Sequence, residues 1–348
     1  MGNREAGLWR WCTVKLGVWL AAGTALGACD GQAAPPVSSP TGPSASAIAP
    51  ASAAAAPPQP AATSQPTSKP EVLSPGTDPS ATAAAKATDD ALPASIQVPK
   101  SVAEAKEKRP FVMLLHGYTG SGRAIASHLG LPALAEAKRL VWAAPDGAKE
   151  KSGRRFWNTG PACCDFDRIG VDHVAALEKL LRRARATALV DPDALYVVGY
   201  SNGGFMAHRL ACELEGIAGI VSVSGLPPSD LGTCQATPST VIQLHGNEDE
   251  IVRFGGGRVL DRTDVEPHPG VVQGMVAWAK RAGCGTAPYS LGKLDLESEI
   301  DGDETERLRF PSCANRMELW LVHGGRHAIL GERRAFSAVI DQLLDQRP

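Results

Sequence analysis

The chain has 348 residues, of which 35 are basic and 37 acidic, giving a formal net charge of −2 and a hydrophobic content of 43%. This length fits one large domain or two average ones. The near balance of charge gives no electrostatic reason to expect nucleic acid as a partner, because such partners select strongly basic surfaces.

The N-terminus has the features of a bacterial export signal. Arg4, Arg10 and Lys15 precede the apolar run LGVWLAAGTAL, which is too short to span a bilayer and fits a signal-peptide core. The run ends in LGAC, which resembles a lipobox, whose cysteine is lipidated and becomes the first mature residue. We therefore predict a lipoprotein signal peptide over residues 1–28 and an extracytoplasmic envelope protein anchored in a membrane through Cys29. An ordinary secretory signal is the alternative.

Residues 29–92 hold this cysteine and a low-complexity tract of alanine, proline and serine. Almost no residue in the tract could enter a core, so we expect a disordered linker. Proline favours extended conformers of roughly 3 Å per residue, which suits a spacer between a membrane and a domain. The globular domain is predicted over residues 93–348.

From about residue 110, apolar runs alternate with segments whose apolar side chains recur at helical spacing. Apolar strands that alternate with helices indicate a doubly wound, mostly parallel α/β sheet covered on both faces. Ligands bind such sheets at the carboxyl ends of the strands. We predict strands at 111–117, 139–145, 194–200, 217–225, 240–246 and 317–324, and helices at 171–186, 203–214, 271–283 and 333–346.

The pentapeptide GYSNG, residues 199–203, places Ser201 between a predicted strand and a predicted helix. It fits the G-x-S-x-G nucleophile elbow, in which side chains at the glycine positions would collide with the neighbouring strand and helix. A serine hydroxyl becomes a good nucleophile only when a base accepts its proton. We predict Ser201 as a catalytic nucleophile, and a structural turn is the alternative.

Candidates for an acid and a base follow the serine in the order typical of α/β-hydrolases. After the strand TVIQLHG in the chain come the carboxylates of Glu248, Asp249 and Glu250, and by position alone each could orient an imidazole. Behind MELWLVHG, His327 lies in a loop that could reach the serine and is the predicted base, whereas His323 ends the strand and fits a structural role. Surface or packing roles are predicted for His128, His173, His208 and His268.

Acyl transfer also needs hydrogen-bond donors for the tetrahedral oxyanion, and the loss of one such donor typically costs on the order of a hundredfold in rate. Two backbone amides are predicted to be these donors. One is the amide of Asn202, next to the serine at the helix start. The other is the amide of Tyr118 in the loop HGYTGSG, where Gly117 provides room. The alternative, a phosphate-binding loop, would need a Walker lysine that HGYTGSG lacks.

Six motifs in chain order, LLHGYTGSG, FWNTGPACCDF, GVDHVAALEKLL, GYSNGGFMAHRLACEL, QLHGNEDEIV and HGGRH, together resemble the polyhydroxybutyrate depolymerase and feruloyl or acetyl-xylan esterase group of α/β-hydrolases. The resemblance spans about residues 108–346 and implies a serine esterase that forms an acyl-enzyme on Ser201. The family's HG-x-x-D-x-x-V segment implies Asp249 as the acid. Its glycine run before the histidine implies His327 as the base, although Arg326 here replaces a glycine of the usual GGGH.

Disulfide bonds are expected, because six cysteines remain when Cys12 in the signal and Cys29 are set aside, and an even number in an exported domain suggests pairing. We predict the pairs Cys212–Cys234 and Cys284–Cys313, each of which would flank neighbouring elements. The vicinal Cys163 and Cys164 resemble the CC pair of the family. No metal site is expected, because neither CxxC spacing nor a histidine partner accompanies these cysteines. The mechanism needs no cofactor.

The residues between the predicted strands 217–225 and 240–246 are too few for a cap domain. An open site is therefore expected, which suits ester bonds on polymers or bulky conjugates. The long loop 146–170 could line the groove, with Trp157 either as a platform for the substrate or packed in the core. The leading hypothesis is an esterase for polyhydroxyalkanoates, feruloyl or acetyl polysaccharides or small esters. A serine peptidase of the same fold and a non-catalytic surface lipoprotein are the alternatives.

Overall fold

The computed structural model describes residues 94–329 and 333–345, all of which belong to one compact unit. The predicted signal peptide, Cys29 and the linker to residue 92 lie outside the described residues. Within the described ranges, no helix combines the length and the apolar character needed to cross a membrane.

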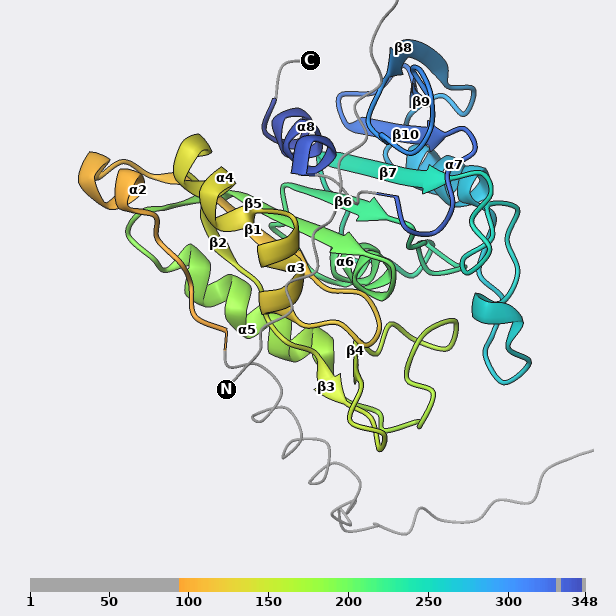
Figure 1. Ribbon diagram of the computed structural model, residues 1–348, viewed down its shortest axis with the longest axis horizontal. Helices are drawn as coiled ribbons and strands as arrows, with labels where there is room; N and C mark the ends of the chain where they lie inside the picture. Colours follow the sequence, from red (N-terminus) through yellow and green to blue (C-terminus); the bar gives the residue numbers. More distant parts are fainter. Residues whose placement is uncertain (1–93, 330–332, 346–348) are drawn as a thin grey trace, which may run out of the picture. The chain divides into compact units, whose positions relative to one another are not determined.

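An eight-stranded sheet forms the centre of the domain, with the order β2-β1-β5-β6-β7-β10-β9-β8 (Figure 1). The strands from β2 to β10 in this order are parallel, and β9 and β8 extend the sheet in antiparallel register beside β10. The mostly parallel sheet confirms the predicted fold class. The strands are β1 (Arg109–Leu115), β2 (Val141–Ala143), β5 (Val190–Tyr200), β6 (Gly219–Val223), β7 (Thr240–Gly246), β8 (Tyr289–Leu294), β9 (Thr305–Arg309) and β10 (Arg316–Val322).

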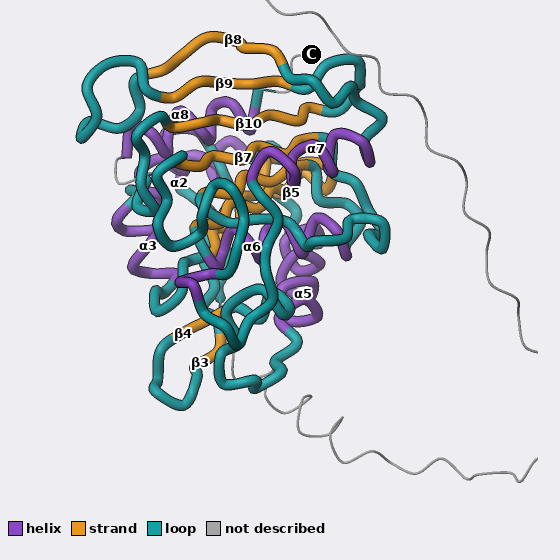
Figure 2. Tube along the Cα trace, turned by 90° about the vertical axis from the view of Figure 1, so that its right-hand side faces the viewer, coloured by secondary structure: helices purple, strands orange, loops and turns teal. Residues whose placement is uncertain are grey.

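Helices cover both faces of the sheet (Figure 2). The core on one face includes side chains of α5 (His173–Arg185), α6 (Asn202–Glu213) and α7 (Val271–Arg281). The core on the other face includes side chains of α3 (Gly122–His128), α4 (Leu131–Lys138) and α8 (Arg333–Leu344). The predicted helix stripes therefore form as expected, because each helix turns its apolar side chains to the sheet.

Strand β7 carries polar residues into one of these two cores. Successive side chains of a strand point to opposite faces. Ile242 and Leu244 belong to the core beside α3, α4 and α8, whereas Val241 belongs to the core beside α6 and α7. Gln243 and His245, which alternate in phase with Val241, are fully buried. The core beside α6 and α7 thus contains hydrogen-bonding groups that must find partners within the protein.

Several short or polar elements were not predicted from the sequence. They are α2 (Lys100–Ala105), α3, α4, the antiparallel pair β3 (Ala148–Lys149) and β4 (Arg155–Phe156), and the strands β8 and β9. Five of the six residues of β8, YSLGKL, are exposed, so this edge strand lacks the apolar run by which buried strands were recognised. Residues 224–239, which join β6 to β7, contain no helix or strand, in agreement with the predicted absence of a cap domain.

Three disulfide bonds join the cysteines of the domain. The structure contains both predicted pairs, Cys212–Cys234 and Cys284–Cys313, and it also joins the vicinal Cys163 and Cys164. The first pair connects α6 to the segment before β7. The second connects the residues that follow α7 to the turn between β9 and β10.

Candidate active site

Ser201 lies in a tight turn between β5 and α6. Its backbone has φ 52° and ψ −118°, a positive φ that is unfavourable for a residue with a Cβ atom. A Cβ atom at Gly199 would lie 2.0 Å from the carbonyl oxygen of Gly203, and one at Gly203 would lie 2.3 Å from that of Leu115. Only glycine fits at these two positions, so the spacing of the pentapeptide follows from steric limits in this turn.

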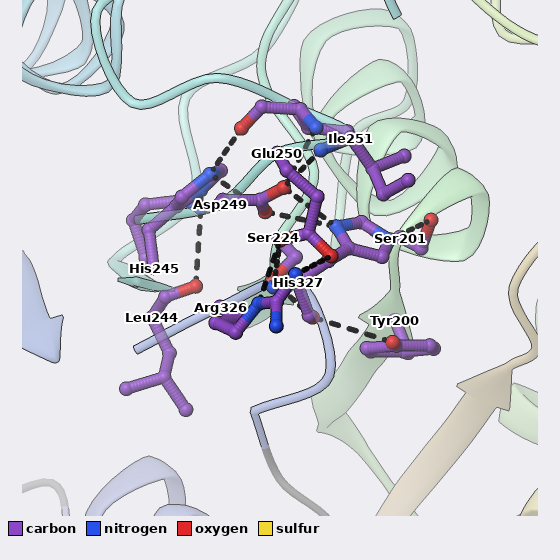
Figure 3. A network of polar contacts seen from close by, with 12 residues as sticks. Tyr200, Ser201, Ser224, Leu244, His245, Asp249, Glu250, Ile251, Arg326 and His327 are labelled. Carbon is purple, nitrogen blue, oxygen red and sulfur yellow. Dashed lines mark hydrogen bonds and ion pairs between the residues drawn. The ribbon is translucent and has the colours of Figure 1, made fainter. Parts of the chain in front are cut away.

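The structure brings the predicted serine, histidine and aspartate into contact (Figure 3). Ser201 Oγ lies 2.9 Å from His327 Nε2, and His327 Nδ1 lies 2.8 Å and 3.0 Å from the two carboxylate oxygens of Asp249. The three side chains follow β5, β10 and β7, whose carboxyl ends meet at one edge of the sheet. Of the other two carboxylates considered from the sequence, Glu248 is exposed and Glu250 pairs with Arg326 at 3.3 Å.

The loops that carry the acid and the base are joined by backbone hydrogen bonds. The amide of Asn247 donates to the carbonyl of Val322 at 3.1 Å, and the amide of Glu248 donates to that of Gly325 at 2.9 Å. A Cβ atom at Gly246 would lie 2.0 Å from the Gly325 oxygen, so the two loops approach this closely only with glycine there. Asp249 and His327 therefore sit on one connected unit.

The backbone of His327 is held from the serine side as well. Its carbonyl oxygen accepts hydrogen bonds from Ser224 Oγ at 3.1 Å and from the Tyr200 hydroxyl at 3.3 Å. Burial, assisted by the negative charge of Asp249, raises the pKa of Tyr200 to about 12. The phenol therefore keeps its proton and remains a donor throughout the neutral range.

The Asp249 carboxylate is fully buried but well supplied with donors. Burial raises the pKa of this carboxyl, whereas its contacts with His245, His327 and the Val252 amide lower the pKa by a larger amount. The net shift of the pKa is therefore downward. The amides of Ile251 and Val252 donate to Oδ1 at 2.9 Å and 2.7 Å. Asp249 is thus ionised at neutral pH and can stabilise an imidazolium at His327.

The backbone before Tyr118 passes directly beside the serine. A Cβ atom added to Gly117 would lie 3.1 Å from Tyr200 Cδ1 and 3.4 Å from Ser201 Cβ, so the chain here runs close to the nucleophile. Asn202 is the first residue of α6, where an amide has no acceptor within the helix. The Tyr118 hydroxyl points elsewhere and donates to Glu150 at 2.7 Å. Both predicted oxyanion residues therefore adjoin the nucleophile through their backbones.

The prediction that Trp157 lines a groove is wrong. Its side chain is fully buried, and its indole N–H donates to the carbonyl of His116 at 2.9 Å. Its own backbone is bracketed by the side chain of Asn202, whose Oδ1 accepts from the Trp157 amide at 2.7 Å and whose Nδ2 donates to the Trp157 carbonyl at 2.9 Å. Trp157 thus packs beneath the site, and the Asn202 side chain ties the loop 146–170 to the start of α6.

Two histidines that were not predicted from the sequence, His116 and His245, are buried beside the site. His116 Nδ1 donates to the Gly117 carbonyl at 2.7 Å, and its Nε2 accepts from the Gly147 amide at 2.9 Å. A signal was present, because β1, β7 and β10 each lead into a His-Gly pair. In the third pair, His323 lies 3.3 Å from Glu306, away from the serine. His173, His208 and His268 are buried and His128 is exposed, as packing and surface roles require.

A cavity of about 620 Å³ lies near the site, and two of its wall residues contact the side chains of Asn202 and Tyr118. Two loops line it, 158–170 and 258–266. Cys163 in its wall has its Sγ 3.7 Å from Asn202 Nδ2, and Phe166 packs edge-on against the Tyr118 ring at 5.1 Å. The wall also carries charges of both signs, from Asp165, Arg168, Arg258, Asp264 and Glu266.

Comparison with known proteins gives matches that agree in kind. The family described as "Phospholipase/Carboxylesterase" matches residues 97–262. "Putative esterase NocK" of Nocardia uniformis subsp. tsuyamanensis is 31% identical over 70% of this chain and 66% of its own length. "Feruloyl esterase B" of Piromyces equi is 26% identical over 53% of this chain and 33% of its own length. The chain thus spans less than two thirds of these relatives. The structure of an acetyl xylan esterase from Aspergillus awamori is 15% identical, with a TM-score of 0.46 over 67% of this chain and 88% of that one.

Proposed function

We propose that this chain, which is similar to the phospholipase/carboxylesterase family over residues 97–262, is a serine esterase that cleaves carboxylic ester bonds. The observation that carries this proposal is the continuous contact from Ser201 Oγ through the His327 imidazole to the Asp249 carboxylate, at 2.9 Å and 2.8 Å. A hydroxyl, a base and an orienting carboxylate in this order are the groups that acyl transfer requires.

In the proposed reaction, Ser201 Oγ attacks the ester carbonyl carbon while His327 Nε2 accepts the hydroxyl proton. The ionised Asp249 stabilises the imidazolium, and the amides of Tyr118 and Asn202 donate to the tetrahedral oxyanion. Collapse of this intermediate breaks the bond to the leaving alkoxide, which takes the proton from His327. Water then attacks the acyl-enzyme with His327 again as base, which releases the carboxylic acid and restores the serine.

The cavity that the loops 158–170 and 258–266 line is the proposed binding site for one part of the ester. Its wall residues Cys163 and Phe166 contact the side chains of Asn202 and Tyr118, so a distal part of the ester could be held there while the carbonyl lies at the two amides. Residues 224–239 add no cap over the serine, which supports a bulky or polymeric substrate such as a polyhydroxyalkanoate or an esterified polysaccharide. The name of the relative "Feruloyl esterase B" favours the second class. Hydrolysis assays with feruloylated xylan, acetylated xylan and a hydroxybutyrate oligomer would rank these candidates.

We also place the proposed esterase outside the cytoplasm, attached to a membrane by a lipid on Cys29 after removal of residues 1–28. The lipobox-like LGAC and the disulfide bonds support this location, because such bonds persist in oxidising compartments. Metabolic labelling with a fatty acid should mark the wild-type chain and leave a Cys29→Ser chain unlabelled. A labelled Cys29→Ser chain would refute the anchor.

Replacement of Ser201 tests the activity directly. Ser201→Ala should lower kcat for a short p-nitrophenyl ester by about a thousandfold or more and abolish labelling by a fluorophosphonate. Ser222→Ala is the matched control, because Ser222 is a buried serine on the neighbouring strand whose hydroxyl has no partner among the described residues. It should retain turnover and labelling. Near-normal turnover by folded Ser201→Ala would overturn the proposed function.

A further inference from the structure

Behind Asp249, a line of buried polar side chains continues away from Ser201. His245 Nε2 lies 3.2 Å from Asp249 Oδ2, a contact drawn in Figure 3. Gln243 Nε2 lies 3.1 Å from His245 Nδ1, and His208 Nε2 lies 2.8 Å from Gln243 Oε1. The line ends at α7, where Trp278 Nε1 lies 3.1 Å from His208 Nδ1. All of these side chains are fully buried.

The indole at the far end fixes the direction of each hydrogen bond. Trp278 Nε1 can only donate, so His208 Nδ1 accepts, and a neutral His208 ring then carries its proton on Nε2. Burial lowers the pKa of His208 to about 4, so this ring is neutral at neutral pH. Its Nε2 donates to the Gln243 carbonyl oxygen, which turns the amide NH₂ group toward His245. The proton of His245 consequently lies on Nε2.

The proton on His245 Nε2 is donated to the Val252 carbonyl at 2.8 Å, and the same nitrogen lies 3.2 Å from Asp249 Oδ2. The other carboxylate oxygen, Oδ1, accepts from the amides of Ile251 and Val252. Oδ1 of Asp249 therefore has two fixed amide donors, and Oδ2 faces the N–H edge of His245 in addition to His327, which opposes rotation of the carboxylate. The opposite tautomer of His245 would turn a nitrogen lone pair toward this anion.

We propose that His245 is a positioning residue, whose Nε2–H, held on the Val252 carbonyl, faces the Asp249 carboxylate and helps to keep it toward His327, and that Trp278, His208 and Gln243 set its tautomer. The inference rests on the proposed function, because only a working His327 makes the orientation of Asp249 count in catalysis. Among the residues that the structure describes, no other side chain takes part in this line between α7 and the acid.

Paired substitutions of His245 in the full-length protein test its role. His245→Leu removes both ring hydrogen bonds at similar volume and should lower kcat for a p-nitrophenyl ester by about tenfold to a hundredfold, with KM within about twofold. His245→Gln keeps an N–H donor near the position of Nε2 and should recover most of the lost kcat. Val241→Ala, on the same face of β7, should lower the melting temperature without this loss of kcat.

A second variant changes the protonation of His245. In Gln243→Glu, a carboxylate can only accept from the neighbouring rings, so His245 should gain a proton on Nδ1, and its positively charged ring would compete with His327 for the Asp249 carboxylate. We expect kcat to fall as in His245→Leu. Nuclear magnetic resonance of ¹⁵N-histidine-labelled protein reports the tautomer directly, with His245 protonated on Nε2 alone in the wild type and on both nitrogens in Gln243→Glu.

The tautomer measurement needs no substrate, so it separates this inference from the proposed activity. An inactive wild-type protein that does not react with a fluorophosphonate would refute the esterase and leave the tautomer result standing. Wild-type His245 protonated on Nδ1, or a folded His245→Leu protein with kcat within about twofold of the wild type, would overturn the inference. If His245→Leu does not fold, the comparison of His245→Gln with Gln243→Glu decides, and equal kcat values in the two would equally overturn it.

Discussion

The two sides of Ser201 are built from different kinds of contact. On the acid side, Asp249 is held by backbone amides and by a line of buried side chains that reaches α7. On the amide side, the Asn202 side chain brackets the backbone of Trp157, and Gly117 lets the chain before Tyr118 pass beside the serine. The acid side thus depends on which nitrogen of an imidazole carries a proton, whereas the amide side depends on where the backbone lies.

This difference follows from what each side has to supply. Proton transfer at His327 requires one tautomer and one ring orientation, which only hydrogen bonds of defined direction can impose. An oxyanion requires N–H groups at fixed positions, and a backbone N–H cannot tautomerise. Substitutions on the acid side should therefore be felt mainly in kcat and in pH dependence. Substitutions on the amide side should also be felt in the stability of the loop 146–170.

The largest effect is expected on the acid side from Asp249→Asn. An asparagine can donate to His327 Nδ1 and so favours the wrong tautomer of the base, which should lower kcat by about ten-thousandfold with little change in KM. Steady-state kinetics with a p-nitrophenyl ester measures this. Glu248→Gln, an exposed carboxylate next to Asp249, is the control and should keep kcat within about twofold. Equal losses in the two variants would remove Asp249 from its proposed role.

The pH dependence of stability should show the cost of a buried neutral imidazole. Burial lowers the pKa of His208 from 6.5 to about 4, so between these values the unfolded chain binds a proton that the folded chain does not. The free energy of unfolding should therefore fall as pH drops below 6.5, by about 3 kcal/mol from this residue at pH 4. Urea unfolding at pH 7 and pH 4 checks it.

His208→Gln isolates this contribution. Burial also lowers the pKa of His173, to about 3, so this second imidazole adds a similar loss that remains in the variant. The decrease between pH 7 and pH 4 should be smaller in His208→Gln than in the wild type. If the decrease were unchanged, His208 would be protonated in the folded protein. The hydrogen-bond directions assigned from Trp278 through His208 and Gln243 would then be wrong.

Asn202→Ala should affect both activity and stability. It leaves the buried amide and carbonyl of Trp157 without their partners, which should cost about 1–3 kcal/mol of unfolding free energy. Displacement of the loop next to the nucleophile should lower kcat by about tenfold to a hundredfold. Asn315→Ala, which removes a single hydrogen bond to Pro238 at 3.0 Å, is the control and should leave kcat unchanged. A stable Asn202→Ala protein with normal kcat would contradict the claim that the amide side depends on the backbone position that Asn202 holds.

The smallest effect is expected where a charged pair lies on the surface beside the base. Arg326 and Glu250 are 3.3 Å apart, but their side chains are 72% and 46% exposed. Such pairs contribute about 0.5 kcal/mol and are screened by salt, so Arg326→Ala should change the melting temperature and kcat little. Thermal unfolding at low and high salt tests this. A tenfold loss of kcat would show that the ion pair shapes the loop before His327.

Periodicity in the sequence predicted most of the sheet and four of its covering helices, because buried strands and amphipathic helices leave apolar patterns. β8 and β9 were not predicted, because YSLGKL in the edge strand β8 is almost entirely exposed and TERLR in β9 is mostly half-buried, so neither forms an apolar run. The short α3 and α4, of 7 and 8 residues, span too few turns for a helical stripe to stand out. Trp157 could have been a platform or core on sequence alone, and its hydrogen bond to His116 decided for the core.

For the candidate site, motif spacing predicted which loops would supply the serine, acid and base. Position alone did not distinguish Asp249 from Glu248 and Glu250, and the resemblance to a family was needed for that choice. The line from Trp278 through His208 to Gln243 could not be predicted from the sequence, because its members lie on α7, α6 and β7 and come into contact only in the folded protein. No local pattern marks a histidine whose partner is a distant glutamine.

The two long-range disulfides bear on how this protein is made. Cys212 lies on α6 one turn after His208, and Cys284 follows α7, which carries Trp278. Each crosslink joins cysteines 22 and 29 positions apart, respectively, and should stabilise the fold by about 3–4 kcal/mol. A recombinant host with a reducing cytosol would leave both helices without these crosslinks. Soluble material from such a host can therefore carry an intact serine and still turn over slowly, and export to a periplasm is the appropriate route for production.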